Sequence, residues 1–349
     1  MSVPYWVSPR EASLLITGRC NLKCRHCSVT SHGDLNTDLP LSEWVLILDE
    51  LKKSKLVKLT ITGGEPFLRP DFPEFLREVF KRPFRFSINT NGTLITPQIV
   101  AAIKKFSSRL NEFMVSLDGP DMKTVDNQRG EGVYRELTAG ISTLREAQLP
   151  FGFYCTVTSL NVDKLNETAE FGLSMGAEWV KFNNFLLAGP VLDNTMIPDR
   201  KAVNRAAEKL SVLAEEHSGK IQGSILDMRE RALRYLSGQL PETGNHAYSC
   251  GGGRSKIAIF PDGRVTPCDH LPDYTLGHIT EQSLEEILKG TAMNTFLEFL
   301  QQPRSDHSVC KKCLHIDHCS GGCPVEPISR SEATGIDRHS CLKTALEEE

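Results

Sequence analysis

The chain has 349 residues, a formal net charge of -4 and an isoelectric point of about 6.2. A chain of this length can bury a substantial core, and typical domain sizes suggest about two domains. Its charge balance lacks the broad excess of lysine and arginine that neutralises many phosphates, so nucleic acid is not an expected partner.

Neither a signal sequence nor a membrane span is predicted. The first ten residues lack a charged segment followed by an apolar one, and no later stretch is apolar over the length of a bilayer. We therefore expect a cytoplasmic protein with no membrane partner. The chain has eleven cysteines. Because this number is odd and the cytosol keeps thiols reduced, metal ligation explains them better than disulfides do.

Between residues 11 and 185, short apolar runs alternate with longer segments of helical period. Helices are expected between the apolar runs, for example at residues 43–53 and 134–147. Strands are predicted at residues 13–17, 56–62, 85–89, 113–117, 151–158 and 179–185. Six such units predict a parallel sheet covered by helices, and they are too few for a closed eight-stranded barrel.

The predicted strands alternate polar and apolar side chains, so each has two different faces. The apolar face includes Leu59, Phe86 and Phe153. The polar face comprises Thr60, Thr62, Ser87, Asn89, Ser116, Asp118, Thr156, Thr158, Lys181 and Asn183. If helices cover the apolar face, the polar face lines the inside of a curved sheet, which indicates a ligand cavity. The alternative is a flat sheet with one solvated face, although helix-connected parallel strands are usually covered on both sides.

The second half begins with an irregular stretch at residues 186–199, followed by helices predicted at 200–217 and 228–237. Residues 238–249 are rich in turn formers and are interpreted as a boundary. A strand at 256–260, the turn formers Pro261-Asp262-Gly263 and an extended run at 264–267 predict a β-hairpin that leads to Cys268. Short helices are expected at 284–289 and 293–301.

Two short motifs follow the first two predicted strands. Cys20, Cys24 and Cys27 lie in one loop, and three thiolates there can hold three irons of a four-iron cluster, leaving one iron for a small ligand. A zinc site that lacks a ligand is the alternative. The segment Thr62-Gly63-Gly64-Glu65-Pro66 offers glycines that allow close backbone approach and a carboxylate that can bind an amine. An ordinary turn before a helix is the other interpretation.

Together these motifs resemble the CxxxCxxC and GGEP motifs of the radical S-adenosylmethionine (SAM) superfamily. The resemblance implies an α/β fold with a partial (β/α)6 barrel. It also implies a [4Fe-4S] cluster whose open iron binds the amine and carboxylate of SAM, and reduction of this cluster would release a 5'-deoxyadenosyl radical.

The resemblance further implies which residues would contact SAM. Glu65 and the backbone of Gly63 and Gly64 would meet the amine, and Pro66 completes their motif. His26 would support the adenine. The remaining candidates are Ser116 and Arg129 for the carboxylate, Asp118 in the same run as Ser116, and Asn89 and Asn91 for the ribose. A serine or asparagine at a strand end is more often a helix cap or turn former.

The seven cysteines after residue 249 are similar in spacing to the SPASM extension of radical SAM proteins. The resemblance implies two auxiliary four-iron clusters, one held by Cys310, Cys313, Cys319 and Cys341 and the other by Cys250, Cys268 and Cys323. A zinc module is the alternative, because His315, His318 and His339 lie near the CxxC elements. The implied domains are a radical SAM core at 1–218, a bridging segment at 219–249 and a small cysteine-rich SPASM domain, with a β-hairpin and short helices, at 250–349.

This grouping leaves Cys155, whose strand face places it against the helices as a small apolar residue. Some SPASM proteins have a further cysteine shortly before the position of Cys250, whereas residues 241–249 contain none. We therefore expect an open or non-cysteine site on that cluster. Asp269 follows Cys268 directly, as in anaerobic sulfatase-maturating enzymes, where this aspartate is thought to take the substrate proton. A turn-capping role is the alternative.

The resemblance implies an oxidoreductase that modifies a peptide or protein side chain and receives electrons from a donor such as flavodoxin or ferredoxin. Many peptide maturases begin with a precursor-binding domain, but the first strand here is expected near residue 11. Either a separate protein then presents the peptide or the substrate differs. The alternatives are a sulfatase-type formylglycine maturase, a small-molecule or tetrapyrrole enzyme and, outside the enzymes, an iron-sulfur electron carrier or zinc regulator.

Overall fold

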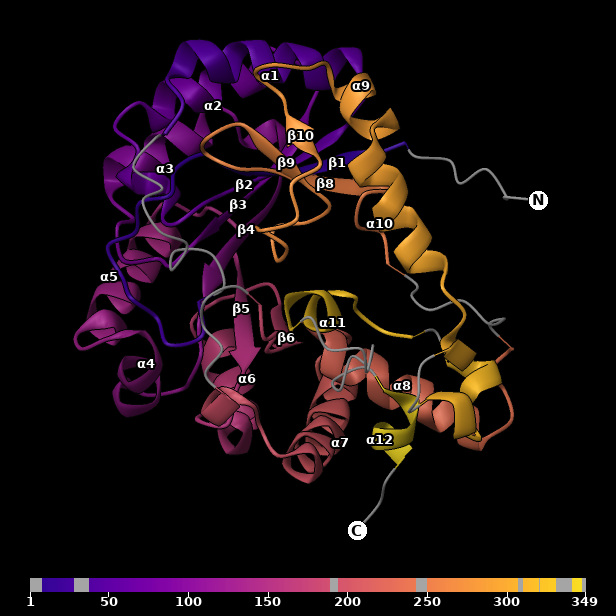
Figure 1. Ribbon diagram of the computed structural model, residues 1–349. Coiled ribbons are helices and arrows are strands. Elements are labelled where there is room, and N and C mark those ends of the chain that lie inside the picture. Colours follow the sequence, from indigo (N-terminus) through magenta and orange to yellow (C-terminus); the bar gives the residue numbers. More distant parts are fainter. Residues whose placement is uncertain are drawn as a thin grey trace.

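A curved, open β-sheet organises the chain (Figure 1). The computed structural model describes residues 8–27, 38–188, 194–242, 250–306, 310–319, 321–330 and 341–346. Within these residues, ten strands form one sheet in the order β10-β9-β8-β1-β2-β3-β4-β5-β6-β7. The first seven are β1 (Glu11–Leu15), β2 (Lys58–Thr62), β3 (Arg85–Thr90), β4 (Leu110–Ser116), β5 (Gly152–Val157), β6 (Val180–Asn184) and β7 (Ile221–Gln222).

Strands β1 to β6 are parallel and alternate with helices, as the sequence predicts. The helices are α1 (Leu41–Lys53), α2 (Phe72–Phe80), α3 (Pro97–Lys104), α4 (Met122–Arg129), α5 (Val133–Glu146), α6 (Leu165–Ser174) and α7 (Arg200–Glu216). Strand β4 begins three residues before its predicted start. The prediction relied on a run of apolar residues, and the polar Asn111 and Glu112 interrupt that run. The expected fold class is correct.

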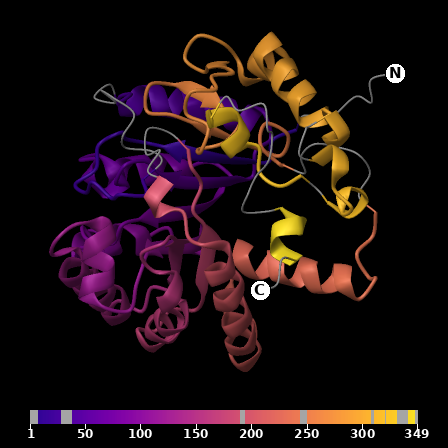
Figure 2. The ribbon, with the colours of Figure 1, turned by 60° about the horizontal axis from the view of Figure 1, so that its bottom comes forward.

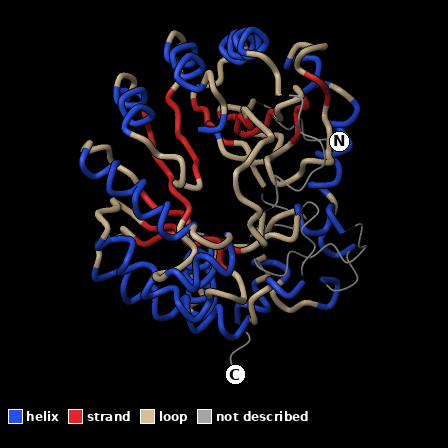
Figure 3. Tube along the Cα trace, turned by 90° about the vertical axis from the view of Figure 1, so that its left-hand side faces the viewer, coloured by secondary structure: helices blue, strands red, loops and turns tan. Residues whose placement is uncertain are grey.

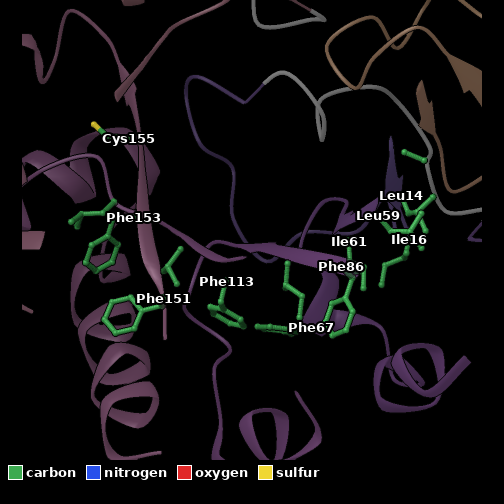
Figure 4. Close-up of a cluster of buried hydrophobic side chains, with 14 of the residues drawn as sticks. Leu14, Ile16, Leu59, Ile61, Phe67, Phe86, Phe113, Phe151, Phe153 and Cys155 are labelled. Atoms are coloured by element: carbon green, nitrogen blue, oxygen red, sulfur yellow. The ribbon is translucent and has the colours of Figure 1, made fainter. Parts of the chain in front are cut away.

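The apolar face of the sheet packs against the outer helices, which Figure 3 shows outside the strands. Leu59, Phe86 and Phe153 all lie in this layer, and Figure 4 shows them on one side of the sheet. Cys155 is also there, with no exposed surface, as predicted. Each fully buried side chain of this size contributes roughly 1.5–3 kcal/mol to folding.

The opposite, inner face of the sheet is polar, which confirms the prediction from strand alternation. The ion pair between Lys181 on β6 and Glu112 on β4 lies on this face, with Nζ and Oε1 2.8 Å apart. Tyr154 of β5 is in register with Lys181 on β6 and with Ser116 on β4, and it is 37% exposed. Paired residues in neighbouring strands share one face, so Ser116 lies next to Tyr154.

The predicted hairpin forms between β8 (Lys256–Ile259) and β9 (Arg264–Thr266), which are antiparallel. Gly263 in its turn has a φ of +88°, a value that favours glycine. The hairpin also joins the main sheet, because β8 pairs in parallel with β1 and aligns Lys256 with Glu11. The short strand β10 (Gly277–His278) completes this edge. Neither this pairing nor β7 at the other edge was expected from the sequence.

The second half of the chain then runs across the open side of the sheet (Figures 1 and 2). It leaves the hairpin through α9 (Leu284–Lys289) and α10 (Thr291–Gln301). Farther along the chain comes α11 (Val325–Arg330), and then α12 (Leu342–Leu346), which packs against α7 and α8 (Ser224–Leu236). In the part of the chain that the structure describes, no helix has both the length and the apolar character needed to cross a membrane.

Candidate functional site

The Gly63-Gly64 turn after β2 packs directly against the start of the cysteine loop. The Gly64 N–H donates to the Thr17 carbonyl at 2.8 Å, and the Glu65 N–H donates to the Arg19 carbonyl at 2.8 Å. A Cβ at Gly63 would overlap the Thr17 backbone, and one at Gly64 would overlap the Arg19 carbonyl. The glycines therefore allow close approach, as predicted, but the approaching backbone is the chain's own.

Glu65 is fully buried directly beyond this turn. Its carboxylate accepts hydrogen bonds from the Asn91 N–H at 2.8 Å, the Thr90 hydroxyl at 2.8 Å and the Phe67 N–H at 3.2 Å. Burial raises the pKa of Glu65 to about 7, although these hydrogen bonds act in the opposite direction. A carboxylate in such a place is well suited to receive a ligand cation, because the cation would restore its charge.

The turn is held in place by the hydrophobic core. Pro66 begins a short 3-10 helix (Pro66–Leu68), and Phe67 within it points into the apolar layer. The Phe67 ring lies 5.0 Å from the ring of Phe72 in an edge-on arrangement and 6.3 Å from that of Phe113 in a stacked one. The position of Glu65 is therefore fixed by packing on its C-terminal side.

The loop with Cys20, Cys24 and Cys27 leaves β1 at the same edge of the sheet. Its start is held by Asp38, which accepts a hydrogen bond from the Thr17 hydroxyl at 2.6 Å. The thiols influence one another: burial raises the pKa of Cys24 to about 11, with Cys27 and Cys20 contributing to the increase and Arg129 opposing it. The pKa of Cys20 is also raised, mainly by burial, and buried thiols of this kind ionise readily only beside a cation, so this donor set fits an iron-sulfur cluster.

A buried charge network lies behind the cysteine loop. Asp118 Oδ2 is 2.6 Å from Arg129 Nε and 3.3 Å from His26 Nε2, and Asp118 Oδ1 accepts from the Thr156 N–H at 2.9 Å. Burial opposes ionisation of Asp118, but the charge of Arg129 holds its pKa below the ordinary value. Burial lowers the pKa of His26 to about 4, so the imidazole is neutral at pH 7. This network connects to the loop, because Arg129 Nη1 is 3.9 Å from Cys24 Sγ.

The predicted asparagines occupy different environments. Asn91 is engaged within the protein: its side chain donates to Asn21 at 2.9 Å and lies 3.9 Å from Cys20 Sγ. Asn89 lies on the inner face, and its buried Oδ1 has no hydrogen-bond partner within the described residues. An unsatisfied buried acceptor is costly, which favours a ligand donor at Asn89. Ser116 lies on the same face, half-buried.

A second group of cysteines comes from the second half of the chain. Cys250, Cys268 and Cys323 meet in a small apolar cluster formed with Phe296. The Gly252 N–H donates to Cys250 Sγ at 3.2 Å. Burial raises the pKa of Cys268 to about 12, and the charge of the neighbouring Asp269 contributes to this increase. These three predicted ligands are therefore brought together by the fold.

Asp269 faces two residues that sequence reasoning missed, Lys256 and Tyr154. Burial raises the pKa of Tyr154 to about 12, and the Asp269 charge contributes to this increase. Burial opposes ionisation of Asp269, but His270 and Lys256 hold its pKa below the ordinary value. Tyr154 could have been found from the sequence, because it alternates with Thr156 on the polar face. Lys256 could not have been assigned to this site from the sequence, because its position depends on the pairing of β8 with β1.

The third group lies on the loop around the short 3-10 helices Cys310–Lys312 and Ile316–His318. The Cys313 N–H donates to the Cys310 carbonyl at 2.9 Å. Burial raises the pKa of Cys341, and Cys319 raises it further, so these two thiols lie near each other. Within the described ranges, no three Cys, His, Asp or Glu side chains already stand at metal-ligand spacing.

Helix α8 and the residues that follow it hold this loop through its histidines. His315 Nδ1 lies 2.8 Å from the Tyr235 hydroxyl, and His318 Nδ1 lies 2.9 Å from the Leu240 carbonyl. The Tyr235 ring packs edge-on against both imidazoles. Each histidine thus uses Nδ1 to hold the loop against the rest of the protein. His339 lies outside the described residues.

Comparisons with known proteins agree with this arrangement. Residues 14–172 match the family model of the radical SAM superfamily, and residues 250–314 match that of SPASM, an iron-sulfur cluster-binding domain. The chain is 29% identical to an AdoMet-dependent heme synthase of Methanosarcina barkeri, over 90% of this chain and 91% of that protein. It is 25% identical to the subtilosin biosynthesis protein AlbA of Bacillus subtilis, over 93% and 69% respectively.

Two solved structures share the fold. Streptococcus suis SuiB bound to its precursor peptide SuiA has a TM-score of 0.77 and 18% identity, over 96% of this chain and 76% of that one. The enzyme anSMEcpe with bound AdoMet has a TM-score of 0.73 and 19% identity, over 97% and 95% respectively. At these identities the similarity shows the fold alone.

Proposed function

Because this chain belongs to the radical SAM superfamily and carries a SPASM domain, we propose that it oxidises or cross-links a side chain of a peptide or protein. The observation that carries the proposal is the position of Tyr154 on the inner face. Tyr154 lies beside Ser116, at the SAM end, and its pKa responds to Asp269, at the auxiliary end. A substrate on this face would therefore meet both sites.

The radical SAM domain binds SAM and a four-iron cluster, which together supply a 5'-deoxyadenosyl radical. We assign the cluster to Cys20, Cys24 and Cys27, and the SAM amine to Glu65. Its buried carboxylate would be ionised by the incoming ammonium group. Arg129, already paired with Asp118, would present its remaining N–H groups beside Cys24. Asn89 supplies an acceptor for a ribose hydroxyl.

At the other end of the face, Asp269 would receive a proton. A substrate carbon that has lost a hydrogen atom still has to release one electron and one proton to complete a two-electron oxidation. Asp269 is held ionised by Lys256 and His270, so it can accept the proton. The adjacent Cys268, Cys250 and Cys323 would hold the group that accepts the electron, and the partly exposed Tyr154 ring would pack against the substrate.

The choice of a peptide substrate is supported by relatives that act in peptide modification. The match to the subtilosin biosynthesis protein extends over 93% of this chain. The fold resembles that of SuiB, whose structure was solved with a bound precursor peptide. A flavodoxin-like or ferredoxin-like donor and a separate precursor-binding protein are the partners we propose. The Cys268-Asp269 pair keeps a sulfatase-type maturase as a special case of this class.

Tetrapyrrole chemistry is the second candidate, and the match to a heme synthase favours it. That match has 29% identity and extends over 91% of the relative. A planar, acidic substrate would also fit a polar inner face that presents Lys256 and Tyr154. Substrate identity therefore separates the two proposals.

The test uses the full chain, reconstituted without oxygen and supplied with SAM and a reductant. About twelve irons per chain are expected for three four-iron clusters. Peptides encoded beside the gene and iron porphyrins are offered separately, and deuterium transfer from the substrate into 5'-deoxyadenosine is measured by mass spectrometry. Cys20→Ala is the control without radical formation. Deuterium transfer from a porphyrin alone would reject the peptide proposal in favour of the second candidate.

A further inference from the structure

Lys256 lies where the two halves of the protein meet. It is the first residue of β8, and its register with Glu11 places it at the end of the sheet opposite the first cysteine loop. Its neighbour Ile257 is 1% exposed and packs in the apolar core, whereas Lys256 is exposed. Because successive residues of a strand point to opposite faces, the Lys256 side chain lies on the inner face.

The backbone fixes Lys256 between two of the proposed ligands. Its N–H donates to the Gly251 carbonyl at 3.2 Å, directly after Cys250. Its carbonyl accepts from the Gly253 N–H at 2.8 Å, and that same N–H lies 3.0 Å from the Pro267 carbonyl, directly before Cys268. The position of Lys256 is thus built into the turn that carries the cysteines.

Other inner-face lysines have carboxylate partners. Lys58 Nζ lies 3.8 Å from Glu11 Oε1, and Lys181 Nζ lies 2.8 Å from Glu112 Oε1. Within the described residues, the Lys256 ammonium makes no such ion pair. Although Lys256 keeps exposed surface, the protein around its ammonium group partly desolvates it and would lower its pKa. Asp269 and then Cys268, Cys250 and Cys323 outweigh this effect and raise the pKa. Its electrostatic partners are the auxiliary site itself.

We propose that Lys256 is the counter-charge of the auxiliary cluster held by Cys250, Cys268 and Cys323, and that it raises the reduction potential of that cluster. This rests on the ligand set assigned under the proposed function. Reduction adds one negative charge to a cluster, and a nearby ammonium group stabilises the reduced form more than the oxidised one. Lys256 is therefore a positioning residue that makes this cluster a better electron acceptor.

The experiment measures cluster potentials by redox titration followed by electron paramagnetic resonance. The full-length reconstituted chain is compared with Lys256→Met and Lys256→Arg, and the signal lost in Cys323→Ala identifies the relevant cluster. We expect Lys256→Met to lower the potential of that cluster alone, while Lys256→Arg keeps it near the original value. Lys58→Met, which removes another inner-face lysine, is the matched control and should leave all potentials unchanged.

Three outcomes would overturn the inference. They are an unchanged potential in Lys256→Met with full iron content, an equal shift of all clusters, and a loss in Lys256→Arg as large as in Lys256→Met. If Lys256→Met does not retain its iron, Lys256→Gln replaces it and the arginine variant still decides whether charge is the cause. The ratio of 5'-deoxyadenosine to product should also rise in Lys256→Met, because hydrogen abstraction continues while the later oxidation slows.

This result is independent of the substrate. An unshifted potential in a variant that still modifies a peptide would reject the role of Lys256 and leave the proposed function intact. A shifted potential in a chain that modifies only porphyrins would reject the peptide proposal and leave the role of Lys256 intact.

Discussion

Gly64 and Arg19 are in direct backbone contact, so close that any side chain at Gly64 would overlap the Arg19 carbonyl. Two hydrogen bonds, from Gly64 to Thr17 and from Glu65 to Arg19, join the segments at this point. The turn after β2 thereby sets where the first cysteine loop leaves β1. The two motifs that resemble those of the radical SAM superfamily are one structural unit.

Gly64→Ala should therefore separate this unit and release the cluster held by the loop. Overpacking usually costs about 1–3 kcal/mol, and a rigid backbone neighbour places this variant at the upper end. We expect a lower Tm and the loss of about four of twelve irons after reconstitution. Gly219→Ala is the control, because a Cβ there meets nothing within 4 Å and only its φ of +77° is unfavourable. Full iron content in Gly64→Ala would contradict the prediction.

Glu65 should make the stability of the cofactor-free protein depend on pH. Burial raises the pKa of Glu65 to about 7 from its ordinary value of 4.5, so the folded state binds its proton more tightly than the unfolded state. The stabilisation is complete below pH 4.5 and is lost as the pH rises through 7. Its size is on the order of 3 kcal/mol. Denaturant unfolding at several pH values should show a flatter profile in Glu65→Gln. The same slope in both proteins would exclude Glu65 as its source.

Asp118→Asn should destabilise the fold, because it leaves Arg129 buried without its counter-charge. The Arg129 side chain is 7% exposed and that of Asp118 is not exposed at all. Breaking such a pair costs about 3–5 kcal/mol. Glu285→Gln removes one partner of an exposed, solvent-screened pair with Lys289 and should change the free energy of unfolding far less than Asp118→Asn does. Urea unfolding of both variants provides the comparison, and equal effects would be inconsistent with the buried network.

Tyr235→Ala should loosen the loop that carries Cys310, Cys313 and Cys319. The variant loses the hydrogen bond to His315 and the ring contacts with both histidines. We expect it to retain about eight of twelve irons. Tyr235→Phe keeps the rings in contact and should retain more. The neighbouring Leu236 is 65% exposed, so Leu236→Ala should keep the full iron content. Iron and sulfide analysis measures all three.

The elements and faces of the sheet could be predicted because they depend on local alternation. The neighbouring residues Leu59 and Thr60 are apolar and polar, which is enough to assign them to opposite faces of β2. Pro261-Asp262-Gly263 consists of turn formers, which is enough to predict the turn. The pairing of β8 with β1 could not be predicted, because it joins residues more than 240 positions apart and leaves no local pattern. Lys256 was missed for that reason. The Gly64 contact was interpreted as room for a ligand, since a glycine does not reveal which neighbour approaches it.

The parallel pairing of β8 with β1 also fixes a length scale. Cys20 follows the C-terminal end of β1, whereas Cys250 precedes the N-terminal end of β8 beside Glu11. The β-hairpin brings Cys268 back to that same end. The two cysteine groups therefore follow and precede opposite ends of these paired strands, and the five residues of β1 span about 13 Å at 3.3 Å per residue. The reacting part of any substrate that meets both cysteine groups therefore has to be long enough, or mobile enough, to span this strand length.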